Sequence, residues 1–301
     1  MSVFPVTTIA RHPPAVVLTQ DTSSRSAILK MAGKSVRHAI VSDDGRKMIG
    51  IVSAKDILNY LGGGDKFEIV KRDCEGNILR ALESPISPIV NRTPLVGSTS
   101  SSLPDMMRLM AKHDIGMLPL LDGASEIWGS LSERHLFRLF EASQMFVKVF
   151  EIMSKPLITL DLKSTLLDAM RMMVKHDIRR IPIMNEGELW GIITVKDIIR
   201  FLASPYVDHI ITMGLSDFLF NTSVAKMSTM NPKTVSPDVD LCDAVKSMNL
   251  ASVGSLIVMS GCRPVGILTE RDFLLKLPKL RGVEFMPDPG KGRVLVGRIH
   301  F

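Results

Sequence analysis

Four short segments of this 301-residue chain share a pattern of residue types that can bind a ligand. Each has Gly, two small or apolar residues, Ser or Thr, two further residues and then Asp. The pattern is complete at Gly50–Asp56, Gly191–Asp197 and Gly266–Asp272, whereas Gly129–His135 ends in His. A hydroxyl followed three residues later by an acid is close to a capping box, which only starts a helix. Asp in place of the usual Glu or Gln, and a position where a strand meets a helix N-terminus, favour ligand binding, because backbone amides converge there.

Two further groups of residues accompany the pattern. Basic pairs stand at the start of a short apolar run in the odd copies, where the even copies have Gly and a small or flexible residue. These aligned pairs are Arg37-His38, Gly116-Met117, Arg179-Arg180 and Gly254-Ser255. Arginine beside a cleft suits phosphate, although neighbours on a strand point to opposite faces, so we expect one of Arg179 and Arg180 to face solvent. Thr159 and Thr234 align before the first helix of their copies, with Thr19 the nearest candidate in the first copy.

The elements that must position these residues form an internal repeat. Residues 107–115 match 170–178 at an offset of 63, and longer offsets of 79 and 75 relate the outer copies. Each copy predicts an amphipathic helix, a short strand, a polar turn, a second strand and a second helix. A unit of roughly 55 residues is near the lower limit for an independent core, so we expect pairing, first with second and third with fourth. The segments 61–84, with three consecutive glycines, and 201–224 are predicted to be connecting loops.

The repeated pattern resembles the CBS-domain family, named from cystathionine beta-synthase. Four copies resemble the gamma subunit of the AMP-activated kinase and archaeal proteins of similar build. The resemblance implies an α/β (α+β) fold in which each repeat is a short sheet flanked by helices, and two repeats form a Bateman module. We place the repeats at 12–62, 84–142, 150–204 and 224–278, the modules at 1–142 and 143–278, and a C-terminal extension at 279–301.

The resemblance also implies a role for each candidate residue, because clefts between paired repeats of that family bind adenosine-type ligands. The Asp of the pattern would hold the ribose hydroxyls, the Ser or Thr would lie near ribose and phosphate, the basic residues would contact phosphate, and the other threonines would border the cleft. The candidates for the ribose are Asp56, Asp197 and Asp272, and those near ribose and phosphate are Ser53, Thr194 and Thr269. The candidates for the phosphate are Arg37, His38, Arg179 and Arg180, and those for the edge of the cleft are Thr19, Thr159 and Thr234. His135 cannot accept two ribose hydroxyl bonds as a carboxylate can, so we expect the second cleft to be empty or to bind differently.

The predicted function is a non-catalytic regulatory sensor of adenine nucleotides that transmits occupancy to a regulated protein or to its own oligomer. AMP is favoured over ADP and ATP, S-adenosylmethionine stays open, and no metal or further cofactor is predicted. An alternative is a nucleic-acid-binding or scaffold protein that uses the basic residues of the C-terminal stretch, which contribute to the net charge of +6. A third is an enzyme using His113 and His176, but both align near a helix C-terminus, where a cation is favoured without any catalytic role.

Composition indicates in which compartment of the cell the protein is expected. The three cysteines have no Cys-x-x-Cys spacing, so we expect neither structural zinc nor a disulfide framework. No apolar segment approaches membrane length, and there is no signal-peptide start. We therefore expect a cytoplasmic protein without a membrane partner, and the scarcity of Trp and Tyr argues against stacking on single-stranded nucleic acid.

Overall fold

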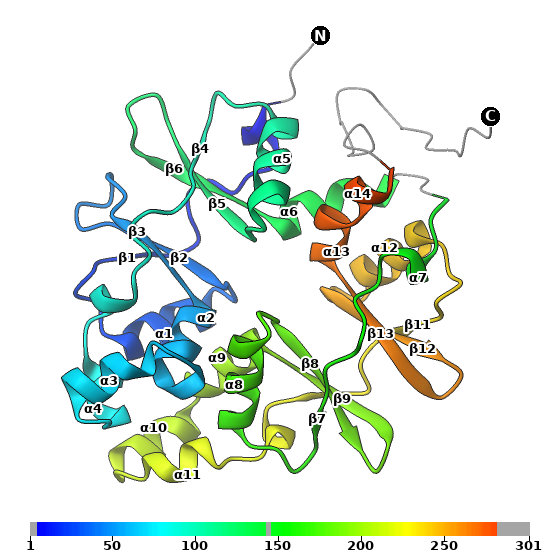
Figure 1. The fold of residues 1–301 in the computed structure, drawn as a ribbon. Helices are drawn as coiled ribbons and strands as arrows, with labels where there is room; N and C mark the ends of the chain where they lie inside the picture. Colours follow the sequence, from blue (N-terminus) through cyan, green and yellow to red (C-terminus); the bar gives the residue numbers. More distant parts are fainter. Residues whose placement is uncertain (1–4, 143–145, 282–301) are drawn as a thin grey trace. The chain divides into compact units, whose positions relative to one another are not determined.

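The computed structural model describes residues 5–142 and 146–281, in which all four repeats have the same order of elements (Figure 1). A very short strand comes first, then a helix, a two-stranded hairpin and a second helix. The first strand pairs in parallel with the second, and the second pairs antiparallel with the third. The mixed fold with four small sheets flanked by helices confirms the predicted fold class, while the two-residue first strand was not predicted.

The first two repeats and their connections contain the following elements. They are β1 (Val17–Leu18), α1 (Ser24–Gly33), β2 (His38–Val41), β3 (Gly50–Ser53), α2 (Ala54–Leu58), the π-helical turn η2 (Asn59–Gly63), α3 (Phe67–Cys74), α4 (Ile78–Glu83), β4 (Gly97–Ser98), α5 (Leu103–His113), β5 (Met117–Leu121), β6 (Ile127–Ser132) and α6 (Glu133–Phe137).

The last two repeats follow the same plan after α7 (Val149–Ile152). They contain β7 (Leu160–Asp161), α8 (Leu166–Lys175), β8 (Arg180–Asn185), β9 (Glu188–Thr194), α9 (Val195–Leu202), α10 (Pro205–Thr212), α11 (Ser216–Phe220), β10 (Thr229–Met230), β11 (Thr234–Val235), α12 (Leu241–Leu250), β12 (Ser255–Ser260), β13 (Arg263–Thr269), α13 (Glu270–Leu275) and α14 (Leu277–Arg281).

The first helix of every repeat begins and ends in the same way. A polar side chain caps its N-terminus by accepting a hydrogen bond from a backbone amide two or three residues on. A residue in the left-handed region follows its C-terminus and turns the chain into the second strand. These turning residues are Ser35, Asp114, Asp177 and Ser252, with φ of 51°, 53°, 52° and 53°. The repeat is therefore regular in its backbone as well as in its sequence.

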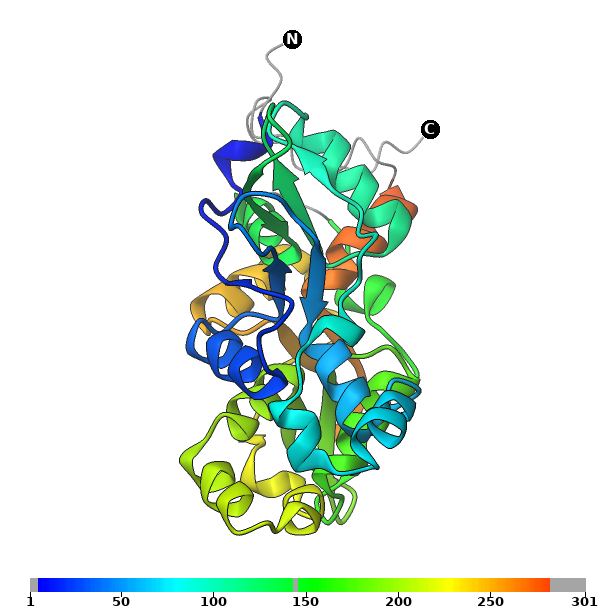
Figure 2. The same cartoon turned by 90° about the vertical axis from the view of Figure 1, so that its left-hand side faces the viewer.

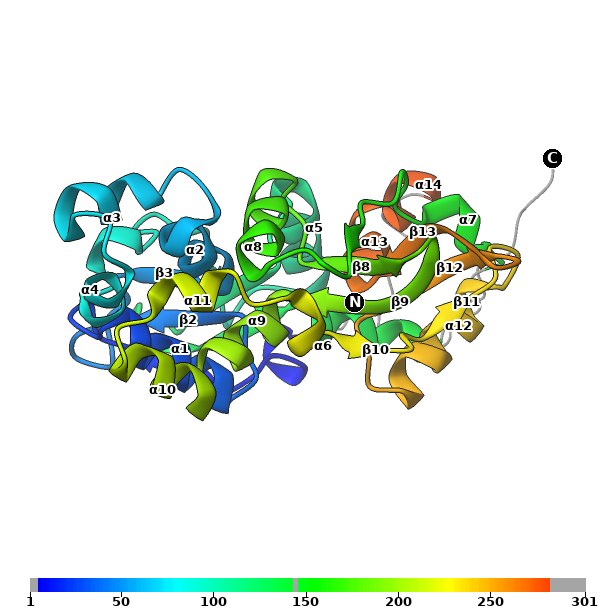
Figure 3. The ribbon, with the colours of Figure 1, turned by 90° about the horizontal axis from the view of Figure 1, so that it is seen from below.

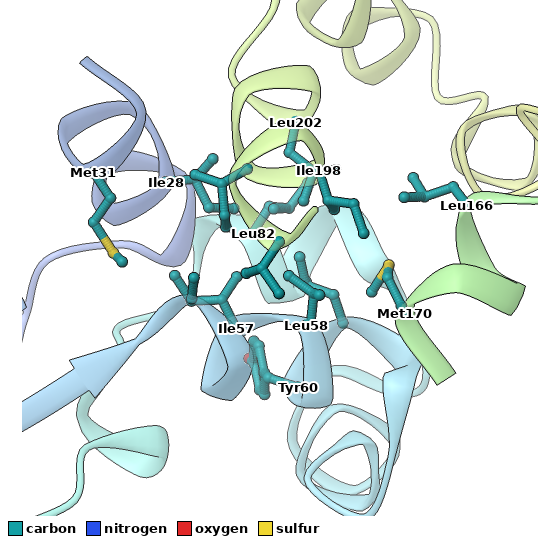
Figure 4. Packing of buried hydrophobic residues seen from close by; sticks show 14 of the residues in the cluster. Ile28, Met31, Ile57, Leu58, Tyr60, Leu82, Leu166, Met170, Ile198 and Leu202 are labelled. Atoms are coloured by element: carbon teal, nitrogen blue, oxygen red, sulfur yellow. The ribbon is translucent and has the colours of Figure 1, made fainter. Parts of the chain in front are cut away.

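The described residues form two compact units. The first unit contains repeats 2 and 4, at 5–13, 95–142, 146–158 and 232–281, and the second contains repeats 1 and 3, at 14–94 and 159–231. In the second unit, helices of repeats 1 and 3 share one apolar core in which Ile28, Leu58, Met170 and Ile198 are buried (Figure 4). In the first unit, helices of repeats 2 and 4 do the same. These units combine repeats across the predicted modules, 1–142 and 143–278, whose packing stays a prediction.

The two connecting segments predicted as loops are largely helical. Residues 61–84 continue α2 through η2 into α3 and α4, and residues 201–224 contain α10 and α11. The glycines of the first segment pack on α8: a Cβ on Gly63 would lie 3.0 Å from the Val174 side chain, and one on Gly64 would lie 2.7 Å from it. Glycine is therefore used for close packing between repeats 1 and 3, and not for a loose connection.

Helices of the described residues are all too short or too polar to cross a membrane. The predicted C-terminal extension lies outside the described residues from position 282 on. So do three of the six basic residues on which the nucleic-acid alternative depends, Lys291, Arg293 and Arg298.

Candidate ligand site

The Asp of the repeated pattern is part of a capping box in all three complete copies. In repeat 3 the backbone amide and the hydroxyl of Thr194 donate to Asp197 Oδ2, at 2.9 and 2.7 Å, and the Asp197 amide donates back to Thr194 Oγ1 at 3.3 Å. Ser53 and Asp56 form the same box at the start of α2, and Thr269 and Asp272 form it at the start of α13. The capping interpretation is therefore correct as local geometry. It uses only one oxygen of each carboxylate, Oδ2.

The second carboxylate oxygen, Oδ1, has a different partner in each repeat. Arg200 Nη1 lies 3.1 Å from Asp197 Oδ1, and the arginine side chain is 65% exposed. Lys66 Nζ lies 2.5 Å from Asp56 Oδ1 and also donates to the carbonyl of Ile89 at 3.2 Å. In repeat 4 two groups reach Oδ1 of Asp272, and its side chain is only 4% exposed. The three patterns are equal in sequence but differ in how accessible their carboxylates are.

The basic pairs lie beside the pattern, as predicted. The Arg179 carbonyl accepts the amide of Val195 at 3.0 Å, and the Arg37 carbonyl accepts the amide of Ala54 at 2.7 Å. These bonds hold the start of each second strand against the first turn of the helix that begins at the repeated pattern, which we call the pattern helix. Arg180 lies directly opposite Thr194 in the antiparallel hairpin. Directly opposite residues share a face of the sheet and neighbours do not, so Arg180 is on the Thr194 face and Arg179 on the other.

The same register applies to the first repeat. His38 lies opposite Ser53, so His38 and not Arg37 shares a face with the hydroxyl of the pattern. Of each predicted basic pair, the second member is therefore the one on the hydroxyl face. All four side chains have contacts within the protein.

Two of the three predicted cleft-edge threonines occupy equivalent positions, and the third does not. Leu160 pairs with Ile183 and Val235 with Val258, so the residues before them, Thr159 and Thr234, are counterparts. In repeat 1, Leu18 pairs with Val41, which makes Val17 the counterpart of Thr159. Thr19 comes after this strand, where its amide donates to Thr22 Oγ1 at 3.1 Å in a turn.

The glycine of the pattern has a role that the sequence analysis missed. The chain just before each first strand, which we call the lead-in segment (9–13, 89–93, 152–156 and 227–231), crosses to the third strand of another repeat. The backbone bridges join Arg11 to Ser130, Asn91 to Ile51, Ser154 to Ile267, and β10 to β9. Figure 3 shows β10 beside β9, and Figure 2 shows the dark blue N-terminal segment beside the green strands of repeat 2.

These crossings exchange segments between repeats 1 and 2, and between repeats 3 and 4. A Cβ on Gly129 would lie 2.1 Å from the Arg11 carbonyl oxygen, and one on Gly50 would lie 2.3 Å from that of Asn91. Only glycine fits such a backbone approach. A glycine within a predicted strand was the signal that could have revealed it.

Repeat 2 retains the cap although it lacks the carboxylate. The Ser132 amide donates to His135 Nδ1 at 3.2 Å, which requires a neutral imidazole with its proton on Nε2. Burial, together with the smaller effect of the charges of Arg138 and Arg11, lowers the pKa of His135 from 6.5 to about 4. The imidazole thus replaces Asp as a helix cap, and the expectation of an empty or different second site stays a prediction.

His113 and His176, the candidates for an enzyme, lie where the alignment placed them. His113 is the last residue of α5 and His176 directly follows α8. Within the described residues, no group of three or more His, Cys, Asp or Glu side chains is arranged to hold a metal ion.

Four repeats with this fold, each with a helix-starting Ser/Thr and Asp or His, define a protein built from CBS domains. The CBS domain family matches residues 6–63, 86–142, 149–204 and 223–279, and the chain belongs to that family. This confirms the resemblance inferred from the repeated pattern.

Two relatives match this chain over nearly the whole of their own length. A 33.4 kDa protein encoded in a ribosomal RNA operon of Thermofilum pendens is 31% identical over 97% of this chain and 98% of its own. A protein of Methanocaldococcus jannaschii is 25% identical over 88% of this chain and 96% of its own. Among solved structures, one from M. jannaschii has a TM-score of 0.83 at 24% identity, covering 90% of this chain and 98% of that chain. One from Pyrococcus horikoshii has a TM-score of 0.56 at 18% identity, with the same coverage.

Proposed function

We propose that this protein is a non-catalytic regulatory protein that binds an adenine nucleotide, AMP in preference to ADP or ATP, at the repeated pattern, with repeat 3 as its best site. The proposal depends on one observation, that the two oxygens of the Asp197 carboxylate have different partners. Oδ2 is used by the helix cap, while Oδ1 faces only a well-exposed arginine, Arg200. The Asp197 side chain is 11% exposed, but its arginine partner is solvated, and solvent screens such a pair. A ribose hydroxyl can therefore replace Arg200 at Oδ1 and keep an acceptor bond to the carboxylate.

The surroundings of Asp197 suit the rest of a nucleoside monophosphate. The start of α9 presents backbone amides and the positive end of the helix dipole. Arg180 lies on the same face as Thr194, and a guanidinium binds phosphate oxygens in a bidentate manner. Thr159 is part of the same unit and directly precedes β7, at the edge of this sheet. One or two arginines balance the charge of a monophosphate.

Occupancy at Asp197 has a physical route to the rest of its unit. The helix that begins at this site, α9, places Ile198, Ile199 and Leu202 in the core shared by repeats 1 and 3. A ligand that favours one position of α9 therefore also favours one packing of that core. Coupling of this kind requires only different affinities for the two arrangements, and the output would be read by a partner protein or by the oligomer.

Isothermal titration with AMP, 2′-deoxy-AMP, ADP, ATP and S-adenosylmethionine tests the proposal. We expect the wild type to bind AMP most tightly, and Asp197→Asn to weaken it at least about tenfold, because a hydroxyl loses a charged acceptor worth about 1.5–3 kcal/mol. The matched control is Asp168→Asn. Asp168 forms the same capping box with Thr165 at the start of α8, outside the repeated pattern.

The control separates ligand binding from helix capping. Unchanged affinity in Asp168→Asn, together with weakened affinity in Asp197→Asn and for the deoxy ligand, supports the ribose site. Equal affinity of the wild type and Asp197→Asn for AMP would contradict that site, and wild-type protein that binds none of the five ligands would contradict the function.

A further inference from the structure

Two charged contacts join repeats 2 and 4 in the first unit, each through an arginine of a helix that begins at the repeated pattern. Arg134, in α6 of repeat 2, donates from Nη1 to Glu270 Oε1 at 2.7 Å and to the Val253 carbonyl at 3.2 Å. Arg271, in α13 of repeat 4, donates in the other direction to the side chain and the carbonyl of Asp114, at 2.9 and 2.8 Å. Each repeat therefore supplies an arginine to the other.

Buried carboxylates accompany these arginines. The side chains of Glu133 and Glu270, the first residues of α6 and α13, are only 2% and 4% exposed, and Arg271 Nη1 lies 3.6 Å from Glu133 Oε1. In the second unit the equivalent first residues are the apolar Ala54 and Val195. The contact of Arg271 with Asp114 has a counterpart in the second unit, where Lys55 of α2 pairs with Asp177 of repeat 3. The buried Glu133 and Glu270 have none, so they are what distinguishes the contact between repeats 2 and 4.

Asp272 is enclosed in the same unit by a closed set of polar contacts. Lys276 Nζ lies 2.7 Å from Asp272 Oδ1, the Ser154 hydroxyl donates to the same oxygen at 2.8 Å, and Lys276 Nζ also donates to Ser154 Oγ at 2.7 Å. Ser154 is fixed by its lead-in segment, whose backbone exchanges two hydrogen bonds with Ile267 of β13, at 2.8 and 3.1 Å. Both oxygens of Asp272 are therefore used by groups that the fold holds in place.

A ribose at Asp272 would have to displace this ammonium and this hydroxyl. The carboxylate would then keep its charge in a 4% exposed position without the lysine that balances it. Lys276 is 38% exposed, so the cost lies in leaving the enclosed Asp272 carboxylate without both its countercharge and the Ser154 hydroxyl. Asp197 is 11% exposed and would give up one arginine that is 65% exposed. Repeat 4 also has Gly254 and Ser255 where repeat 3 has two arginines.

We propose that the two units have different tasks: repeats 1 and 3 bind the ligand, whereas repeats 2 and 4 form a structural half that binds none. Ser154 and Lys276 occupy the carboxylate oxygen that Asp272 would otherwise offer to a ribose hydroxyl. Repeat 2 lacks this oxygen because it has His135 in place of Asp. This inference rests on the proposed function in one respect, that the Asp of the pattern accepts the ribose hydroxyls.

Equilibrium dialysis of the full chain with labelled AMP tests the assignment. Lys66 also holds Oδ1 of Asp56, but that carboxylate is 25% exposed, whereas Asp272 is 4% exposed and is held by the Ser154 hydroxyl as well. We expect at most two AMP per chain, one at Asp56 and one at Asp197, and no binding in the double variant Asp56→Asn/Asp197→Asn. The single variant Asp272→Asn should keep the wild-type stoichiometry and a Kd within about twofold. A third equivalent in the wild type, or one remaining equivalent in the double variant, overturns the inference while leaving nucleotide binding intact.

Thermal unfolding without ligand tests the structural half separately. Asn at position 272 must turn its amide group toward either the lysine or the helix cap, so we expect its Tm to fall by roughly 5–10 °C. Asp197→Asn, with the same cap and an exposed partner, should lower Tm by much less. Equal Tm losses in the two variants would overturn the structural assignment whether or not AMP binds. Wild-type protein that binds no AMP would refute the proposed function, and with it the ligand-binding task of repeats 1 and 3.

Discussion

The imidazole of His135 predicts a defined loss of stability in mild acid. It caps α6 as a neutral acceptor, and its pKa is lowered from 6.5 to about 4, mainly by burial. The unfolded chain takes up this proton at pH near 6.5, whereas the folded protein resists it until pH near 4. The stabilisation is therefore complete above pH 6.5, falls as pH decreases, and is lost below about 4.

The size of this effect follows from the two pKa values. Each pKa unit corresponds to about 1.4 kcal/mol, so protonation of His135 lowers the free energy of unfolding by up to about 3 kcal/mol across this window. Urea unfolding between pH 4 and 7 measures it. In His135→Asn the side-chain oxygen can still accept the Ser132 amide but does not titrate, so we expect a distinctly flatter pH dependence.

The difference between the profiles of the wild type and His135→Asn isolates this one group from the carboxylates that titrate nearby. Parallel profiles for these two proteins would refute the argument from the cap.

Two further predictions concern packing and charge in the first unit. Gly129→Ala should lower the free energy of unfolding by about 2 kcal/mol in a urea titration, because its Cβ meets the Arg11 carbonyl at 2.1 Å, whereas Gly123→Ala, with nothing within 4 Å, should stay within about 0.5 kcal/mol. Equal losses of stability in Gly129→Ala and Gly123→Ala would mean that the lead-in segment moves away from the new Cβ without strain. Arg134→Met should lower the free energy of unfolding by about 3 kcal/mol by weakening the compensation of buried Glu270. Arg108→Met breaks an exposed pair with Asp105 and should lower the free energy of unfolding by less than about 1 kcal/mol. A similar loss of stability in both variants would contradict the role of Arg134 as the countercharge of Glu270.

Much of the fold was predictable because the repeat makes each signal appear four times. The pattern residues Ser53, Thr194 and Thr269 start helices where predicted, and the basic pairs lie beside them. His113 and His176 are at helix ends as the alignment indicated. Local signals of this kind depend only on residues close in sequence, which a pattern can reveal.

Features that depend on distant residues were not predictable in the same way. First strands of two residues are too short to show alternation, so β1 and its counterparts were missed. The partners of Asp272 come from Ser154, in another repeat's lead-in segment, and from Lys276, and nothing in the pattern distinguishes Asp272 from Asp197. Lys276 is only four residues after Asp272 and could have been noticed in the sequence, whereas Ser154 is brought to Asp272 by tertiary packing.

The exchange of lead-in segments has a consequence for the order in which the chain is completed during synthesis. Repeat 1 needs Asn91 and repeat 3 needs β10, both of which leave the ribosome after the hairpins that they cover. Repeats 2 and 4 use Arg11 and Ser154, which have already been made. In each pair the earlier sheet has an open edge, prone to pairing with a neighbouring nascent chain, until the later repeat begins to emerge. The smallest stretch that can cover the third strands of its own hairpins is therefore a pair of repeats and not a single one.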